Sequence, residues 1–213
     1  MPSVTAQSSG SYSGERYRRR YTSILWEEKR LTAYNRSMSF NFIDSIKAGP
    51  EYLAIQTYYG NRTAARSVVP LMNHINEGLI VLNAVNASSE AMAGFCLHPL
   101  FQNDEELTTV GYQYTLDRLG LPTSIRALML TMEYRRVANK YLADCDTTKI
   151  ELSPLKEVND MLIADKVQNR KDFLKYHYGK HPNSTRLDEY FKEWLATPGI
   201  SEARYSELIT LLP

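Results

Sequence analysis

Apolar residues recur at three- and four-residue spacing along most of the chain after Ser23, which is the pattern of amphipathic helices. Alternation with a period of two is rare, so strands are not expected. The expected helices cover residues 24–36, 51–59, 70–85, 88–99, 122–143 and 153–178, followed by two more near the C-terminus. The loops are expected at 37–50, 60–69 and 144–152. The pattern predicts an all-α fold, a helical bundle that forms one domain over residues 23–213.

Helix ends can be placed from residues that start or stop helices. Pro99 is expected to end the fourth helix, since proline cannot continue a helix. Ser153 is expected to cap the helix that follows it, with Pro154 in the first turn. Thr185 and Asp188 have the spacing of a capping box for the penultimate helix.

The first 22 residues differ in character from the rest. Residues 1–14 are polar, small and almost uncharged, so they cannot bury enough apolar surface to fold, and 1–22 is predicted to be a flexible tail. Within it, ERYRRRY at 15–21 interleaves four arginines with two tyrosines. That mixture suits phosphate pairing and base stacking. The alternative is that this short basic cluster is the solvated start of the first helix. Nucleic acid is therefore not expected as a partner except at this segment.

Composition and charge restrict the class of protein without naming a partner. The 213 residues carry a formal net charge of +1 with pI near 7.7, and this balance gives no general attraction to nucleic acid or to a membrane. No apolar run approaches the length of a membrane span, and the N-terminus lacks a signal-peptide core. We therefore expect a cytoplasmic protein without a membrane partner. Cys96 and Cys145 are expected to be buried free thiols.

His74, His98 and Asp165 stand out as candidate metal ligands, because each lies among apolar residues of an expected helix. A lone histidine in such a place is more often a hydrogen-bonded core residue than a ligand. Asp165, in LIADK at 162–166, is harder to explain, because a buried carboxylate needs a partner. A shared cation or a histidine would supply one.

Three segments together resemble the hydrolase domain of the RelA/SpoT family, within the HD superfamily. They are ARSVVPLMNHINEGLIVL (65–82), AMAGFCLHPLFQND (91–104) and MLIADKVQNRKDFL (161–174). Their order and spacing are similar to those of the small stand-alone (p)ppGpp hydrolases, and the resemblance is strongest over residues 51–175. The pattern also resembles small HD-type proteins encoded by bacteriophages.

The resemblance implies an α-helical HD fold with a divalent cation of the manganese type between helices. It implies that His74, His98 and Asp165 are the inherited ligands, so their polar atoms are expected within about 5 Å of one another. It also implies a nucleotide ligand, with Arg66, Lys166 and Asn169 near its phosphates or ribose. The alternative for Lys166 is a solvated helix face without a ligand.

The chain departs from the family at the residues that carry the chemistry. Where the family has a ligand aspartate after the second histidine, this chain has Pro99, and where the family has an acidic pair it has Gln102 and Asn103. Amides cannot accept a proton from an attacking water at neutral pH. Asp104 and Glu105 follow directly and could replace the lost acids if the helix start shifts. With one anionic ligand missing, cation binding is expected to be weak or absent.

These departures leave three functional hypotheses. The first is a degenerate HD domain that binds a nucleotide or a protein partner with little or no hydrolysis. The second is an active metal-dependent phosphohydrolase that uses Asp104 or Glu105 as its base. The third is a structural or assembly protein, as a homo-oligomer or with a protein partner, for which fifteen tyrosines supply interface-capable side chains.

Overall fold

The structure is a computed structural model that describes residues 42–65, 67–113, 124–139, 150–180 and 182–213. Residues 43–213 form one compact unit. Within the described residues the chain is helical, and its only extended pairing is an isolated antiparallel bridge between Thr63 and Pro70. The predicted all-α class is therefore confirmed. The expected tail, the expected helix at 24–36 and Cys145 lie outside the described residues.

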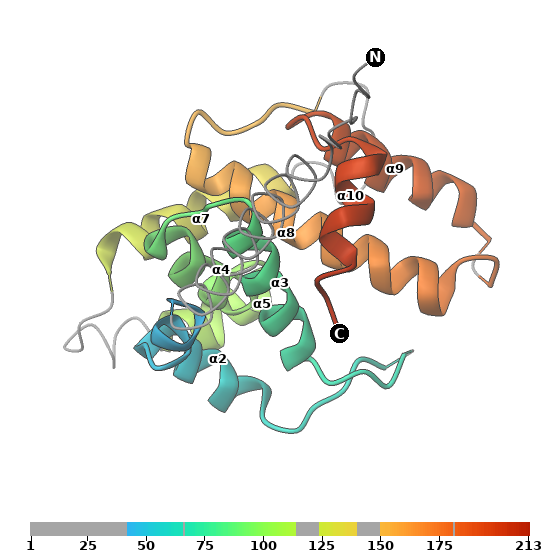
Figure 1. The fold of residues 1–213 in the computed structure, drawn as a ribbon. Coiled ribbons are helices and arrows are strands. Elements are labelled where there is room, and N and C mark those ends of the chain that lie inside the picture. Colours follow the sequence, from blue (N-terminus) through green and yellow to red (C-terminus); the bar gives the residue numbers. More distant parts are fainter. Residues whose placement is uncertain (1–41, 66, 114–123, 140–149, 181) are drawn as a thin grey trace, which may run out of the picture. The chain divides into compact units, whose positions relative to one another are not determined.

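The helices follow the chain order shown in Figure 1. They are α2 (Pro50–Tyr59), α3 (Met72–Ala84), α4 (Ser89–Phe101), the short α5 (Asp104–Glu106), the π-helix η1 (Leu107–Gly111), α7 (Ile125–Asn139), α8 (Lys156–Asp172), the π-helix η2 (Phe173–His177), α9 (Ser184–Ala196) and α10 (Glu202–Ile209).

Helix α4 is the central element of the described unit, packing against α2, α3, α7 and α8 (Figure 1). Most of its side chains are buried, including Phe95, Cys96 and His98, as expected for a helix that is apolar on nearly all sides. Gly78 lets α3 approach it closely, since a Cβ there would lie 2.1 Å from Cε1 of Phe95. Helix α8 packs against both α3 and α4. The centres of α3, α4 and α8 are thereby held side by side.

Residues 42–47, which were expected to lie in a loop, are helical. Three predicted helix boundaries are also wrong. Pro99 does not end its helix, because α4 continues through it to Phe101. Helix α8 begins at Lys156, three residues after Ser153, whose hydroxyl donates to Glu133 Oε1 and accepts from the N–H of Leu155. Helix α9 begins at Ser184 with Asn183 as its N-cap residue, so the expected capping box does not form there.

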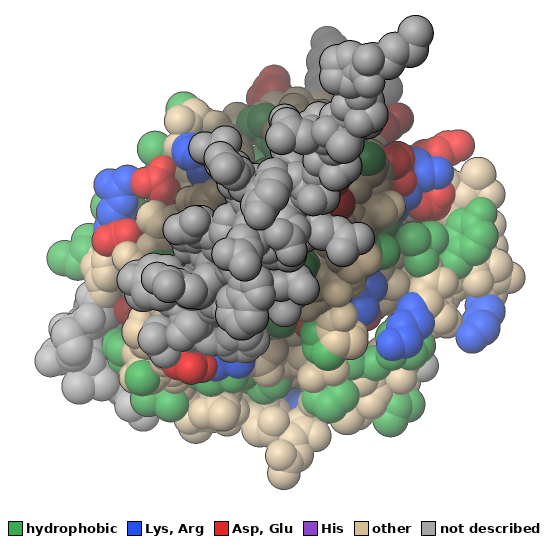
Figure 2. All heavy atoms as spheres, in the orientation of Figure 1, with side chains coloured by type: hydrophobic (Ala, Val, Ile, Leu, Met, Phe, Trp, Pro, Cys, Tyr) green, Lys and Arg blue, Asp and Glu red, His purple; other side chains and the backbone are tan. Residues whose placement is uncertain are grey.

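The surface mixes charges of both signs. Around the grey atoms in Figure 2, acidic, basic and apolar side chains are all exposed, in keeping with the near-zero net charge. Among the described helices, none combines the length and the apolar character that a membrane crossing requires. An apolar cavity of about 780 Å³ lies between α7 and the start of α8, where Ile125, Met129 and Leu155 are exposed. A protein partner or a homo-oligomer stays a prediction.

Candidate metal centre and adjoining cavities

Helices α3, α4 and α8 each contribute one side chain to a cluster of His74, His98 and Asp165. One ligand atom from each residue lies within 4.8 Å of the other two, as expected from the sequence. The two histidine Nε2 atoms are 3.2 Å apart, and His74 Nε2 is 3.6 Å from Asp165 Oδ1. Asp165 and His98 are buried, while His74 is partly exposed. The cluster therefore opens to one side at His74.

The proton position on His74 follows from its contact with Gln168. The side-chain amide of Gln168 donates to Asp172 Oδ2 at 2.7 Å and to Glu77 Oε2 at 3.3 Å, so its nitrogen faces the two carboxylates. Its oxygen therefore faces His74 Nδ1, 2.7 Å away. Because an amide oxygen only accepts, Nδ1 must carry the proton. Nε2 is then the nitrogen that faces His98 and Asp165.

His98 reaches the same state through the backbone. Its Nδ1 lies 2.6 Å from the carbonyl oxygen of Phe95, which only accepts, so Nδ1 is again the protonated nitrogen. Burial and the neighbouring His74 lower the pKa of His98 to about 3, so the ring is neutral at physiological pH. Its Nε2 therefore carries a lone pair that faces His74.

Two imidazole Nε2 atoms and a carboxylate oxygen thus converge on one point. Two acceptors 3.2 Å apart repel each other unless a proton or a metal cation lies between them. A divalent ion such as zinc binds imidazole nitrogen and carboxylate oxygen at about 2.0–2.2 Å, which places neighbouring ligand atoms roughly 3.0–3.5 Å apart for octahedral to tetrahedral angles. The separations of 3.2 and 3.6 Å that involve His74 are close to that range, and all three ligand atoms lie within 4.8 Å of one another. Two imidazoles and a carboxylate are therefore a donor set that suits a divalent cation.

Both histidines also have the hydrogen bonds typical of metal ligands. A ligand histidine usually donates its other ring N–H to a carbonyl or carboxylate, which fixes the ring and the tautomer. Here the acceptors are the Gln168 amide and the Phe95 carbonyl. Gln168 was missed from the sequence, although it lies one helical turn after Asp165 and so on the same face of α8.

Asp165 is held by two neighbours on its own helix. Its Oδ2 pairs with the ammonium of Lys166 at 2.9 Å, and its Oδ1 accepts from Asn169 Nδ2 at 2.8 Å. Burial by itself raises the pKa of Asp165, but the charge and hydrogen bond of the Lys166 ammonium oppose this, and the net pKa is lowered to about 2. The carboxylate is therefore ionised, and Oδ1 is the oxygen that faces His74.

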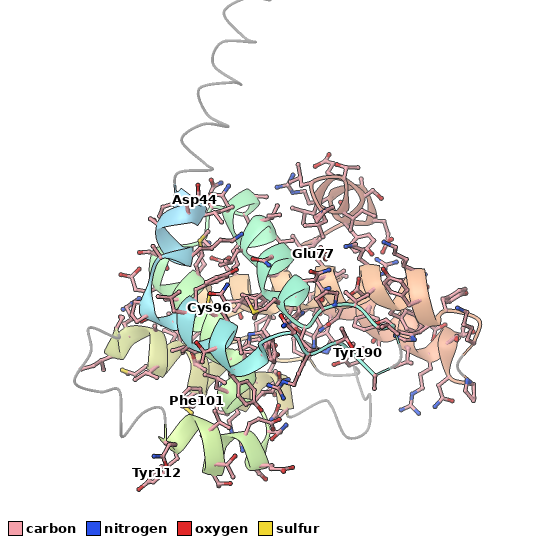
Figure 3. The ribbon with its side chains drawn as sticks, turned by 90° about the horizontal axis from the view of Figure 1, so that it is seen from below. Asp44, Glu77, Cys96, Phe101, Tyr112 and Tyr190 are labelled. Carbon is pink, nitrogen blue, oxygen red and sulfur yellow. The ribbon has the colours of Figure 1, made fainter. Side chains whose placement is uncertain are left out.

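The ammonium of Lys166 is enclosed by protein. The residue is 4% exposed. Its Nζ lies 5.2 Å from the ring centre of Trp194 and 5.6 Å from that of Tyr190, both residues of α9. Tyr190 is labelled in Figure 3. Burial lowers the pKa of Lys166, but Asp165 more than offsets this, so the net pKa is raised and the side chain is charged. Its role here is to neutralise Asp165.

Of the three residues expected near a nucleotide, the structure describes Lys166 and Asn169. Lys166 and Asn169 both contact Asp165, and both line the cavity next to the cluster. Arg66 lies outside the described residues. Tyr134 was not expected from the sequence: its ring centre lies 5.0 Å from that of His98, and burial together with Asp165 raises its pKa well above the usual value. It closes the inner side of the cluster.

Two adjoining cavities open beside the cluster. The smaller, about 300 Å³, is lined by the three cluster residues together with residues of the 64–71 loop and of α8. The larger, about 710 Å³, is lined by side chains that include Tyr58, Arg62, Glu106 and Asn139. The two share Tyr59, Leu71, Pro99 and Gln102 as walls. Together they could accommodate a ligand with one end at the cluster.

The acids proposed as replacement bases lie elsewhere. Asp104 is paired with Arg135 and its side chain is 90% exposed, while Glu105 is exposed. Neither residue lines either of these two cavities. Glu106 does line the larger one, and its Oε2 is a buried atom that has no hydrogen-bond partner among the described residues.

Similarity to known proteins gives no guide to this cluster. No protein-family model, no curated protein and no solved structure matches the chain.

Proposed function

We propose that the chain is a metal-binding protein of the HD type, holding one divalent cation through His74 Nε2, His98 Nε2 and Asp165 Oδ1. The cavities beside the cation would take a phosphate-bearing small molecule such as a nucleotide. The observation that carries the proposal is the pair of imidazole Nε2 atoms that face each other at 3.2 Å beside the Asp165 carboxylate, while both Nδ1 atoms are bonded to oxygen acceptors.

The cavity walls favour binding over hydrolysis. Gln102 and Asn103 line the larger cavity, and the side-chain oxygen of Asn103 is used in accepting from the N–H of Glu106. Neither amide can act as a general base at neutral pH. With Asp104 and Glu105 outside the cavities, we expect little or no turnover of (p)ppGpp or related nucleotides.

An active phosphohydrolase is the second candidate, and one observation favours it. Glu106 brings a carboxylate to the wall of the larger cavity, next to the shared residues Pro99 and Gln102. If the protein hydrolyses a nucleotide, the geometry favours Glu106 as the base over Asp104 or Glu105. A general base typically contributes about 10²–10⁴-fold in rate, so Glu106→Gln would reduce any activity accordingly.

The proposal is tested by titrating chelator-treated protein with zinc or manganese in a calorimeter. We expect one site per chain, with His98→Gln and Asp165→Asn each weakening it at least tenfold. Thermal melts with a nucleotide panel, each with and without the metal, then test the cavity, because a ligand that binds only the folded state raises the melting temperature. Failure to bind any divalent cation at millimolar concentration would contradict the metal site.

A further inference from the structure

Pro99 lies inside α4, directly after His98. In an α-helix the N–H of residue 99 would donate to the carbonyl of residue 95, four positions earlier. Proline has no N–H, and its ring crowds that same carbonyl. The carbonyl of Phe95 therefore lacks the donor that any other residue at position 99 would supply.

The group that donates to this carbonyl is the imidazole of His98. Its Nδ1 lies 2.6 Å from the Phe95 oxygen, and His98 is 2% exposed, so water is largely excluded from the contact. A buried carbonyl needs a donor and a buried N–H needs an acceptor. Each satisfies the other, and the ring is left with Nδ1 protonated and Nε2 facing His74.

We propose that Pro99 is a positioning residue: by removing a backbone donor, it assigns the Phe95 carbonyl to His98 and fixes the tautomer that leaves Nε2 free as a ligand. The role of His98 Nε2 as a ligand rests on the proposed metal centre, but the effect of Pro99 on the His98 tautomer does not. It also accounts for a proline within a buried helix, where proline is normally destabilising. Pro99, at the position where the resembling family has a ligand aspartate, would thereby orient His98 as a ligand.

The test is Pro99→Ala, which restores the backbone N–H while favouring the helix. In the metal-free protein, nitrogen-15 spectra of the imidazoles should show His98 wholly as the Nδ1–H tautomer in the wild type and as a mixture in the variant. Loss of a hydrogen bond that orients a ligand typically costs about 10–100-fold in metal affinity, so the dissociation constant for zinc should rise by that factor. The melting temperature should rise as well, because the helix regains a hydrogen bond.

Pro154→Ala is the matched control, since Pro154 is exposed and lies outside the helices. It should change neither the tautomer nor the zinc affinity. Affinity falling while stability rises separates a positioning role from a structural one, in which affinity would not move. The proposal is overturned if wild-type His98 is protonated on Nε2, or if Pro99→Ala keeps a pure Nδ1–H tautomer. The tautomer measurement needs no metal, so it stands even if zinc does not bind.

Discussion

Replacing Lys166 by methionine removes the cation that neutralises Asp165 while keeping a side chain of similar length. The ion pair is buried on both sides, with each side chain 5% exposed. Breaking a buried pair by removing one partner costs about 3–5 kcal/mol, because the other charge is left uncompensated. Asn169 still donates to the carboxylate, so we expect the lower end of this range. In a chain of this size each kcal/mol corresponds to roughly 2–4 °C, which predicts a fall in melting temperature of about 6–12 °C.

A divalent cation should reverse much of this loss. In the wild type, a cation binding Asp165 Oδ1 is repelled by the ammonium held at Oδ2, whereas in Lys166→Met it supplies the missing positive charge. At a hundred times its dissociation constant, a ligand stabilises the folded state by about 2.7 kcal/mol. The assay is thermal unfolding with a chelator and with a zinc series. The zinc-induced rise in melting temperature should be larger in Lys166→Met than in the wild type.

Lys171→Met is the matched control, because it breaks another ion pair of α8 with a buried carboxylate, that of Glu77. It should also lower the melting temperature, but zinc should rescue it no more than it stabilises the wild type. The reasoning is refuted if Lys166→Met is as stable as the wild type. It is equally refuted if zinc raises the melting temperatures of all three proteins by the same amount.

Two further predictions concern stability without metal. The pKa of His98 is about 3 in the folded state and 6.5 in the unfolded chain, so the unfolded state binds more protons as the pH falls below 6.5. Lowering the pH from 7 to 5 should therefore cost the wild type about 2 kcal/mol from this residue, measured by urea unfolding with a chelator, and His98→Gln should lack this component. Glu106→Gln should leave the free energy of unfolding unchanged or higher, because Oε2 has no partner to lose. Glu77→Gln should lower it, since Glu77 is paired with Lys171, and a loss of stability in Glu106→Gln equal to that in Glu77→Gln would contradict this.

The fold class and the three cluster positions could be predicted from the sequence. Helical periodicity needs only the order of apolar residues, and α2 matches its expected range within one residue, with Gly60 just beyond its end. The convergence of His74, His98 and Asp165 followed from the resemblance, because spacing alone cannot bring three separate helices together. Periodicity is a local signal, whereas the cluster depends on how α3, α4 and α8 pack.

What could not be predicted is the hydrogen bonding that defines the site. Pro99 looked like a helix end because proline lacks a donor, yet α4 continues through it, with the Phe95 carbonyl bonded to His98 instead. The resemblance implied that Lys166 lies near a nucleotide, but its ammonium is enclosed by aromatic rings from α9, which is distant in sequence. For Lys166 the enclosing partners come from a remote element, which no local pattern encodes. For Pro99 the bond is local, but the pattern cannot show that a side chain replaces the missing backbone donor.

The central claim is that His74, His98 and Asp165 hold a divalent cation, and X-ray absorption spectroscopy of the zinc-loaded protein tests it most directly. The fine structure should show two imidazole nitrogens among the nearest ligands, at about 2.0–2.1 Å. In His98→Gln the same spectrum should lose one imidazole. A nearest shell without imidazole, or one that His98→Gln leaves unchanged, would contradict the metal centre.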